Sequence, residues 1–368
     1  METPCFLIHR NKFTDNCKDI LDSFQKFWPG RVGCGYSVKT NNHVMMLKLA
    51  LEQNLYAEVV SEEEYKKVRE CGFENDRIIY NGPVKGKAQI DACKKGAKIN
   101  VDHFKELREL VEKCGSATDK MNIGLRINFD LESMVPGETS TGDDVGRFGF
   151  SYENGDFDKA LQFLKDNSVK LAGLHVHYTT KTRSLAVFEA IAQKISEVYE
   201  KYQLQPDYID IGGGFWGGRI MEGKPSMEEY AEAIVNILMK RIRPNTELIL
   251  EPGSAMSATV VDYITTVDSV KDIRGTRIVT VDGSSLHINP FMNRRVPTYL
   301  LPELRGKNVS KQEICGATCL ENDRFVTLEN EREIEEGTRI IFTNAGAYTM
   351  SLVSEFIVKK PTVYLADE

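Results

Sequence analysis

The sequence of 368 residues contains no run of about 18 apolar residues, which excludes a membrane-spanning helix. It has no block of lysine and arginine, and its formal net charge is -7, so nucleic acid is a poor candidate for a partner. The segment Met1-Glu-Thr-Pro-Cys-Phe6 has no basic stretch followed by an apolar one, and we expect no signal peptide. We therefore expect a cytoplasmic protein that acts on a small molecule.

Eight cysteines are scattered through the chain and do not crowd into a short segment. This distribution is typical of reduced thiols in a cytoplasmic protein and not of a disulfide framework. Cys315 and Cys319 have no second pair of cysteines or histidines nearby. We therefore expect no metal site.

Short β-rich runs alternate with charged, helical stretches as far as Gly253, which favours βαβ units and a parallel sheet. Eight strands close a (β/α)8 TIM barrel, an α/β architecture. The eight runs are Val32–Lys39, Ala57–Ser61, Ile78–Pro83, Lys98–Asp102, Asn122–Asn128, Leu171–Tyr178, Tyr208–Gly214 and Glu247–Gly253.

After Gly253 the β-rich runs follow one another without a regular helix between them, which predicts a second, mostly antiparallel β domain. The run Pro4–His9 precedes the barrel, and we expect it to pair into that domain. The predicted limits are 20–255 for the barrel and 256–368, with 1–19, for the β domain.

Polar residues gather where the predicted strands end, which in a TIM barrel is the face that carries the active site. Strand ends are also polar in proteins without such a site, so this pattern alone leaves both explanations open. The residues are Lys39, Ser61, Asn81, Asp102, Arg126, Asn128, His177, Gly212–Gly214 and Glu251.

Lys39 ends an otherwise small and apolar strand, where burial would lower its pKa and make a Schiff base accessible. The alternative is a surface lysine. Gly212, Gly213 and Gly214 lack Cβ atoms, so their backbone N–H groups could approach a phosphate. The alternative is a tight turn without a ligand.

His177 could stack on a flat cofactor ring, and period-two alternation places His175 on the same side of the strand. Glu251 could pair with a ring nitrogen and keep it protonated. Core histidines and an ordinary acid at a turn are the alternatives. In the β domain, the thiol of Cys319 could donate a proton, and Cys319 and Tyr348 could equally be structural.

Taken in order, these segments resemble the barrel-type (fold type III) decarboxylases that depend on pyridoxal 5′-phosphate (PLP), a family that includes diaminopimelate and eukaryotic-type ornithine decarboxylases. The match extends from about residue 4 to about residue 360. The matching segments are Tyr36-Ser-Val-Lys-Thr-Asn41, Gly173-Leu-His-Val-His177, Asp210-Ile-Gly-Gly-Gly-Phe215, Glu251-Pro-Gly253, Gly316-Ala-Thr-Cys319 with Asp323, and Gly346-Ala-Tyr348.

The resemblance implies that Lys39 forms the Schiff base with PLP, that His177 stacks on its ring and that Glu251 pairs with its nitrogen. The glycines 212–214 and Tyr348 would bind its phosphate with Thr180, and we count Arg126 among the cofactor-binding residues. Cys319, from the second subunit of a head-to-tail homodimer, would protonate the substrate carbon. Asp323 would line the substrate end of the site.

Two positions depart from the family pattern. Ser254 stands where the family usually has an arginine that assists phosphate binding, which predicts a compensating donor elsewhere. Leu320 stands where an acidic residue usually recognises the distal amine of the substrate. Because a leucine cannot pair with an ammonium group, diaminopimelate and ornithine become doubtful substrates.

The segment His287–Pro297, which falls where the family sets its specificity, offers Arg294 and Arg295 to a distal carboxylate or to a larger acidic conjugate. Both arginines could also be plain surface charge. We therefore expect a decarboxylase that acts on a modified or conjugated amino acid. The alternatives are a racemase of the same architecture, diaminopimelate decarboxylase proper, a PLP-binding protein without catalysis, and an inactive relative.

Overall fold

The computed structural model describes residues 1–368 except 115–120, 143, 219–220, 294–295, 354 and 368. Its contacts divide the chain into two compact units. The barrel unit contains residues 14–39 and 47–256, and the β unit contains residues 1–13, 40–46 and 257–368. The domain limits derived from the sequence remain a prediction.

Eight parallel strands form the barrel unit, each pairs with its neighbours, and the β5–β6 pair closes the ring. This confirms the predicted (β/α)8 barrel. A two-residue strand, β7 (Phe150–Ser151), adds to β6. The eight strands are β2 (Val32–Ser37), β3 (Tyr56–Val59), β4 (Ile78–Tyr80), β5 (Lys98–Val101), β6 (Asn122–Asn128), β8 (Gly173–His175), β9 (Tyr208–Asp210) and β10 (Glu247–Leu250).

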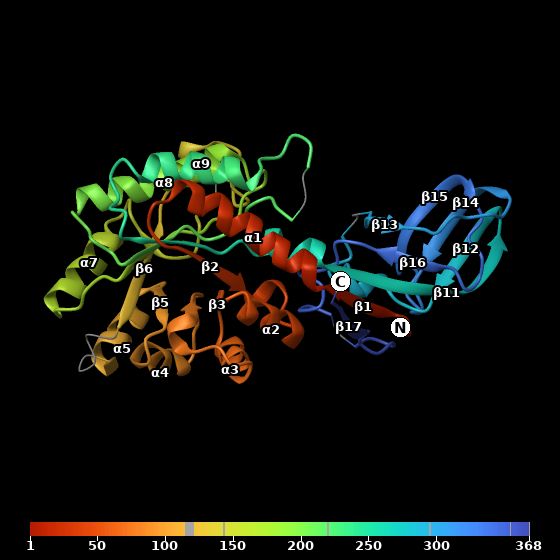
Figure 1. Ribbon diagram of the computed structural model, residues 1–368, viewed down its shortest axis with the longest axis horizontal. Helices are drawn as coiled ribbons and strands as arrows, with labels where there is room; N and C mark the ends of the chain where they lie inside the picture. Colours follow the sequence, from red (N-terminus) through yellow and green to blue (C-terminus); the bar gives the residue numbers. More distant parts are fainter. Residues whose placement is uncertain (115–120, 143, 219–220, 294–295, 354, 368) are drawn as a thin grey trace. The chain divides into compact units, whose positions relative to one another are not determined.

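Helices surround these strands (Figure 1). Most are amphipathic and bury one face; α9, for example, begins with a capping box between Ser226 and Glu229. No helix in the described ranges combines the length and the apolar character that crossing a bilayer requires. The helices are α1 (Arg10–Phe27), α2 (Val44–Glu52), α3 (Glu62–Glu70), α4 (Ala88–Lys94), α5 (Phe104–Cys114), α6 (Leu131–Met134), α7 (Asp156–Asp166), α8 (Leu185–Lys201), α9 (Met227–Leu238) and α10 (Ser254–Ser257).

The barrel interior is filled by large side chains near the N-terminal ends of the strands. Tyr56 and Tyr208, the first residues of β3 and β9, pack with Ile79, Ala172 and Ile249 in a buried cluster. Packing closes this end, and in a TIM barrel the active site lies at the opposite, C-terminal end.

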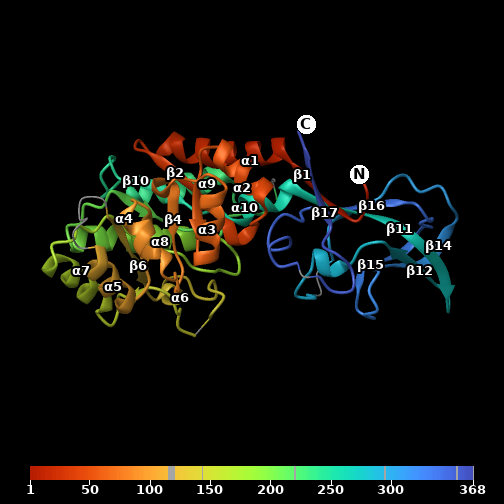
Figure 2. The same ribbon diagram turned by 90° about the horizontal axis from the view of Figure 1, so that it is seen from below.

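The β unit is one eight-stranded sheet, in which five described pairings are antiparallel and two, β1·β17 and β12·β14, are parallel. This confirms a mostly antiparallel domain, and β1 pairs into it as predicted. Figure 2 shows β11, β12, β14 and β15 together. The strands are β1 (Cys5–His9), β11 (Val261–Ile273), β12 (Thr276–Val281), β13 (Tyr299–Leu300), β14 (Asn308–Cys315), β15 (Arg324–Arg332), β16 (Arg339–Phe342) and β17 (Thr362–Ala366).

Candidate active site

Lys39 lies in a 3-10 turn, Val38–Thr40, directly after β2. Its Nζ forms an ion pair with Oε2 of Glu58, a buried residue near the end of β3. The two strands are neighbours in the barrel, so their ends bring the lysine and the carboxylate together. The lysine is therefore held beside a buried carboxylate at the C-terminal face of the barrel.

Two buried amides connect the carboxylates of this face. Asn81 donates from Nδ2 to Oε1 of Glu251 at 2.6 Å and to Oε1 of Glu58 at 3.1 Å. Asn100 donates to Oδ1 of Asn81 at 2.9 Å and to Oδ2 of Asp210 at 3.3 Å. The amides thereby connect Glu58, Glu251 and Asp210 in one buried network.

The carboxyl groups of Asp210 and Glu251 lie close enough to hydrogen-bond to each other when one of them is protonated. Burial, together with the charges of Asp210 and Glu58, raises the pKa of Glu251 well above its ordinary value. Burial raises the pKa of Asp210 to about 7. Both pKa values are therefore raised, at the position predicted to face a ring nitrogen.

His177 lies two residues beyond β8, and its Nδ1 accepts a hydrogen bond from the backbone N–H of Gly213 at 3.1 Å. Its backbone oxygen accepts from Nη2 of Arg126 at 3.0 Å. Burial and the Arg126 charge lower the pKa of His177 to about 3, so the imidazole is neutral. A neutral ring is the form that packs against a flat aromatic cofactor without a desolvation cost.

The glycine loop after β9 lies against His177 and Glu251 so closely that side chains are excluded. A Cβ atom on Gly213 would lie 1.9 Å from the carbonyl oxygen of Glu251, and one on Gly212 would lie 2.7 Å from the His177 ring. Gly212 and Gly214 have φ values of 66° and 103°, which favour glycine. The N–H groups of Gly212 and Gly213 donate to Asp210 and His177, and only Gly214 of the three glycines is partly exposed, so the role of this loop in phosphate binding remains a prediction.

These residues fit a flat, phosphorylated pyridine. An amine, a carboxyl pair with raised pKa values, a neutral imidazole and a glycine loop converge at one end of the barrel. His175, fully buried, has neither ring nitrogen hydrogen-bonded, and its Nε2 lies 3.8 Å from Oε2 of Glu251. His175, Asp210 and Glu251 could also gather around a cation. However, Asn81, Asn100 and the Gly212 N–H already bind both carboxylates, which fits a hydrogen-bonded network better.

In the β unit, Cys319 is exposed, and Asp323 is buried and holds the loop that carries it. Oδ1 of Asp323 accepts from the N–H and Oγ of Ser285 at 2.8 and 2.7 Å. Oδ2 accepts from the N–H and Oγ1 of Thr318 at 3.2 and 2.6 Å. Four donors thus bind this carboxylate, and their hydrogen bonds outweigh burial and lower its pKa. Leu320 is half-buried in the same loop.

Tyr348 lies on the loop after β16 with a left-handed backbone, φ 55°. Its N–H donates to the carbonyl oxygen of Thr40, the residue that follows Lys39, at 2.8 Å. Its side chain is 45% exposed. Non-glycine residues in this conformation are enriched at functional sites, and the role of Tyr348 in phosphate binding remains a prediction.

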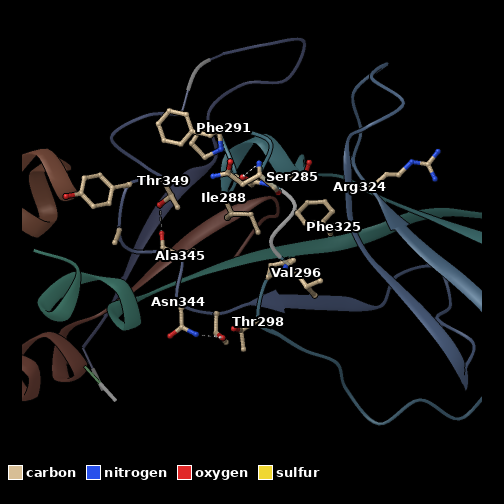
Figure 3. A pocket seen from close by; sticks show the side chains of 17 residues that line it. Ser285, Ile288, Phe291, Val296, Thr298, Arg324, Phe325, Asn344, Ala345 and Thr349 are labelled. Carbon is tan, nitrogen blue, oxygen red and sulfur yellow. Dashed lines mark hydrogen bonds between the residues drawn. The ribbon is translucent and has the colours of Figure 1, made fainter. Parts of the chain in front are cut away.

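A cavity of about 330 Å³ lies beside Tyr348 in the β unit (Figure 3). Phe291, Val296 and Phe325 supply apolar surface, and Ser285 and Thr298 supply hydroxyl groups. Among its described lining residues, Arg324 is the one charged side chain, and it binds Glu313 and Glu321. Figure 3 shows its guanidinium turned away from the other labelled side chains.

Two predicted residues, Arg294 and Arg295, lie outside the described residues. Thr180 lies on the loop between His177 and α8, and it forms an isolated β-bridge with Thr139. Sequence analysis missed Glu58, Asn100 and Asp210 as parts of the site. Asp210 lies two residues before Gly212 of the glycine loop, and Glu58 lies near a strand end. These positions could have identified both residues.

Comparison with known families decides the class of the protein. Residues 11–258 match the pyridoxal binding domain of the pyridoxal-dependent decarboxylases, and these residues make up more than half of the chain. The chain belongs to the pyridoxal-dependent decarboxylase family. It is a PLP-dependent amino-acid decarboxylase, as the resemblance implied, and PLP is its cofactor.

Curated relatives of this decarboxylase include two diaminopimelate decarboxylases. The enzyme from Bacillus subtilis (strain 168) is 27% identical over 90% of this chain and 79% of its own length. The enzyme from Aquifex aeolicus (strain VF5) is 26% identical over 96% of this chain and 84% of its own length.

Solved structures share the fold of this decarboxylase. Diaminopimelate decarboxylase from M. jannaschii in complex with L-lysine has a TM-score of 0.87 at 21% identity, over 99% of this chain and 87% of that one. Lysine/ornithine decarboxylase from Vibrio vulnificus in complex with cadaverine has a TM-score of 0.78 at 18% identity, over 100% and 95%.

Proposed function

We propose that this decarboxylase acts on a modified or conjugated amino acid and not on diaminopimelate or ornithine. The observation that carries the proposal is Leu320, which takes the position of the acid that pairs with a distal ammonium group in the family. Burial of an unpaired ammonium against a leucine would be costly. The cavity beside Tyr348 adds support, because its described lining offers hydroxyl groups and apolar surface but no carboxylate.

The residues of the barrel unit take defined roles in this proposal. When bound, PLP supplies an electron sink for the carbon that loses its carboxylate. Lys39 would hold the cofactor covalently, and Glu58 would position its Nζ. Glu251 would hold a proton at the ring nitrogen, with Asp210 and Asn81 keeping the carboxyl group in place. His177 would pack against the ring.

The phosphate would bind against the loop Gly212–Gly214, with help from Thr180 and Tyr348. Arg126 would hold the backbone of His177, and thereby its ring, through the 3.0 Å contact with the His177 carbonyl. Cys319 would return a proton to the substrate carbon after the carboxylate has left. Asp323 would position the Cys319 loop beside the substrate end.

We also propose a homodimer in which Cys319 and Asp323 serve the site of the other subunit. Support comes from the exposed thiol of Cys319 and from exposed apolar side chains near the cavity, Phe291, Val296 and Leu300. Such surface is typical of an interface. The eight free cysteines support the proposed cytoplasmic location.

A substrate panel tests the choice of substrate. Purified enzyme loaded with PLP is offered diaminopimelate, ornithine, lysine and their N-acylated or carboxylated conjugates, and release of CO2 is measured. We expect turnover of a conjugate and slow turnover of the free diamino acids. Turnover of diaminopimelate or ornithine at about 1–10³ per second would contradict the proposal. Leu320→Glu, with Leu352→Glu as an exposed control, is expected to raise activity toward the free diamino acids.

The same assay separates decarboxylation from racemisation. A single enantiomer is supplied, and CO2 release is compared with the change in optical rotation. A racemase would lose optical rotation without release of CO2, whereas we expect the two signals to change together.

A further inference from the structure

Ser254 leaves the phosphate side of the barrel site without the arginine that the family carries at this position. Ser254 is the first residue of α10 and follows Glu251-Pro-Gly253 directly. Nη1 of Arg183 donates a hydrogen bond to Oγ of this serine at 3.3 Å. The same nitrogen donates to the carbonyl oxygen of Phe215 at 3.2 Å. We propose that Arg183 replaces the missing arginine and binds the cofactor phosphate.

The position of Arg183 supports this assignment. Phe215 directly follows Gly214, so the guanidinium contacts the end of the glycine loop and Ser254 at once. Arg183 lies on the loop between β8 and α8, which also carries His177 and Thr180. Three segments of the barrel unit therefore converge on one cation at the side where the phosphate is proposed to bind.

The side chain is also held in place before any ligand binds. The Arg183 guanidinium lies over the ring of Trp216, 4.6 Å from its centroid. Nε1 of Trp216 donates to the carbonyl oxygen of Thr182 at 2.8 Å. Oη of Tyr230 donates to the carbonyl oxygen of Arg183. Arg183 itself has a φ of 55°. A left-handed arginine persists where its surroundings enforce it, and such residues cluster at ligand sites.

The chemistry of the ligand explains why a cation is needed there. A phosphate ester carries between one and two negative charges at neutral pH. Backbone N–H groups can donate hydrogen bonds to a phosphate but bring no full charge. A guanidinium supplies the charge and a fork of donors suited to phosphate oxygens. Arg183 would therefore give the site its preference for a phosphorylated cofactor.

The test compares two ligands that differ only in the phosphate, PLP and pyridoxal. Calorimetry measures their dissociation constants with the full-length, cofactor-free protein. Arg183→Asn removes the charge and suits the left-handed backbone. We expect the dissociation constant for PLP to rise about 10- to 100-fold and that for pyridoxal to stay within about twofold. In the double variant Arg183→Asn/Ser254→Arg, most of the affinity for PLP is expected to return.

Matched variants define the outcomes. Lys224→Ala removes the other cation over Trp216, 5.0 Å from its ring, and is expected to change neither constant. Equal weakening of PLP and pyridoxal by Arg183→Asn would mean that Arg183 only shapes the site, which overturns the proposal. A phosphate-specific loss in Arg219→Gln, but not in Arg183→Asn, would overturn it as well, since Arg219 is the competing cation outside the described residues.

The inference rests on the phosphate site proposed at Gly212–Gly214, and a third variant separates the two. Gly213→Ala is expected to abolish the preference for PLP over pyridoxal, because its Cβ would meet the Glu251 carbonyl oxygen at 1.9 Å. If Gly213→Ala leaves that preference unchanged, the phosphate site itself is misplaced. If Gly213→Ala abolishes the preference and Arg183→Asn does not affect it, only the role of Arg183 is wrong.

Discussion

Nδ2 of Asn81 lies 2.6 Å from Oε1 of Glu251, and the same nitrogen lies 3.1 Å from Oε1 of Glu58. One amide from β4's C-terminal end therefore binds both the partner of Lys39 and the carboxyl group assigned to the ring nitrogen. This contact joins the proposed attachment point of the cofactor to the carboxyl group proposed to face its ring nitrogen.

Lys39→Ala is expected to abolish covalent attachment of PLP and decarboxylation. The amine that attaches the cofactor is then absent, while Glu58 loses its ion-pair partner. Absorbance spectra and borohydride reduction followed by peptide mapping check this, with the label expected on Lys39 in the unmodified protein. Lys48→Ala, an exposed position in α2, is the control. Retention of the reducible absorbance band in Lys39→Ala would assign the attachment to another lysine.

Glu251→Gln is expected to lower kcat by about 10²–10⁴ and to change KM little, because a glutamine cannot hold a transferable proton at the ring nitrogen. Steady-state kinetics with the fully loaded enzyme measure both constants. Glu247→Gln, at the other end of β10, serves as the control. Its carboxylate accepts from Tyr56 at 2.7 Å and pairs with Arg31, so we expect lower stability with kcat retained. Similar losses of kcat in both variants would argue against a special role of Glu251.

Asp210→Asn is expected to reduce the loss of stability that the cofactor-free protein shows between pH 5 and pH 8. The raised pKa of Asp210 means that the folded protein binds a proton there which the unfolded chain has already released. Stability from this group is thus fully present below about pH 4 and declines as pH rises through the folded-state pKa. Removal of the titrating carboxyl abolishes this decline.

Thermal unfolding midpoints at the two pH values measure the effect, at about 2–4 °C for each kcal/mol. The lowered pKa values of His175 and His177 act in the opposite sense below about pH 6.5. Both histidines are present in the two proteins, so their contribution cancels in the difference. Asp207→Asn, an exposed carboxylate paired with Lys170, is the control and should leave the pH dependence unchanged.

Mixing two inactive variants tests the shared site. Lys39→Ala and Cys319→Ala each remove a different half of every site, so neither is expected to be active alone. Random exchange of subunits would give heterodimers in half of the population, each with one intact site. We expect activity to return to about a quarter of the unmodified value after mixing. Mixtures that stay inactive, although light scattering shows exchanged dimers, would place both residues in sites formed by one subunit.

Local patterns in the sequence were sufficient for the barrel. Eight runs with polar ends predicted the eight strands, because parallel strands bring their C-terminal ends to one face. Lys39, His177 and Glu251 were proposed as site residues for that reason, and the structure places all three at that face. Two local features were not predicted, the 3-10 turn at Lys39 and the end of β8 at His175, two residues before His177. Strand ends depend on the hydrogen-bonding partners of neighbouring strands, which the local sequence does not give.

The links between these residues could not be found from the sequence, because their members lie far apart along the chain. Asn100, Asp210 and Glu251 become neighbours only when the ring of strands closes. For Asp323, the tertiary structure showed four donors around a carboxylate that sequence analysis had assigned to the substrate end.

The sequence by itself determined the fold, the cofactor and the reaction class, because strand periodicity and the order of six short motifs can be recognised without knowledge of any tertiary contact. Only the tertiary structure decided which carboxyl groups lie together and which cation lies beside Ser254. Those properties depend on distances of about 3 Å between side chains from different strands and loops. Arg183 shows this most clearly, since nothing in its local sequence links it to Ser254, and folding of the barrel unit brings the two together.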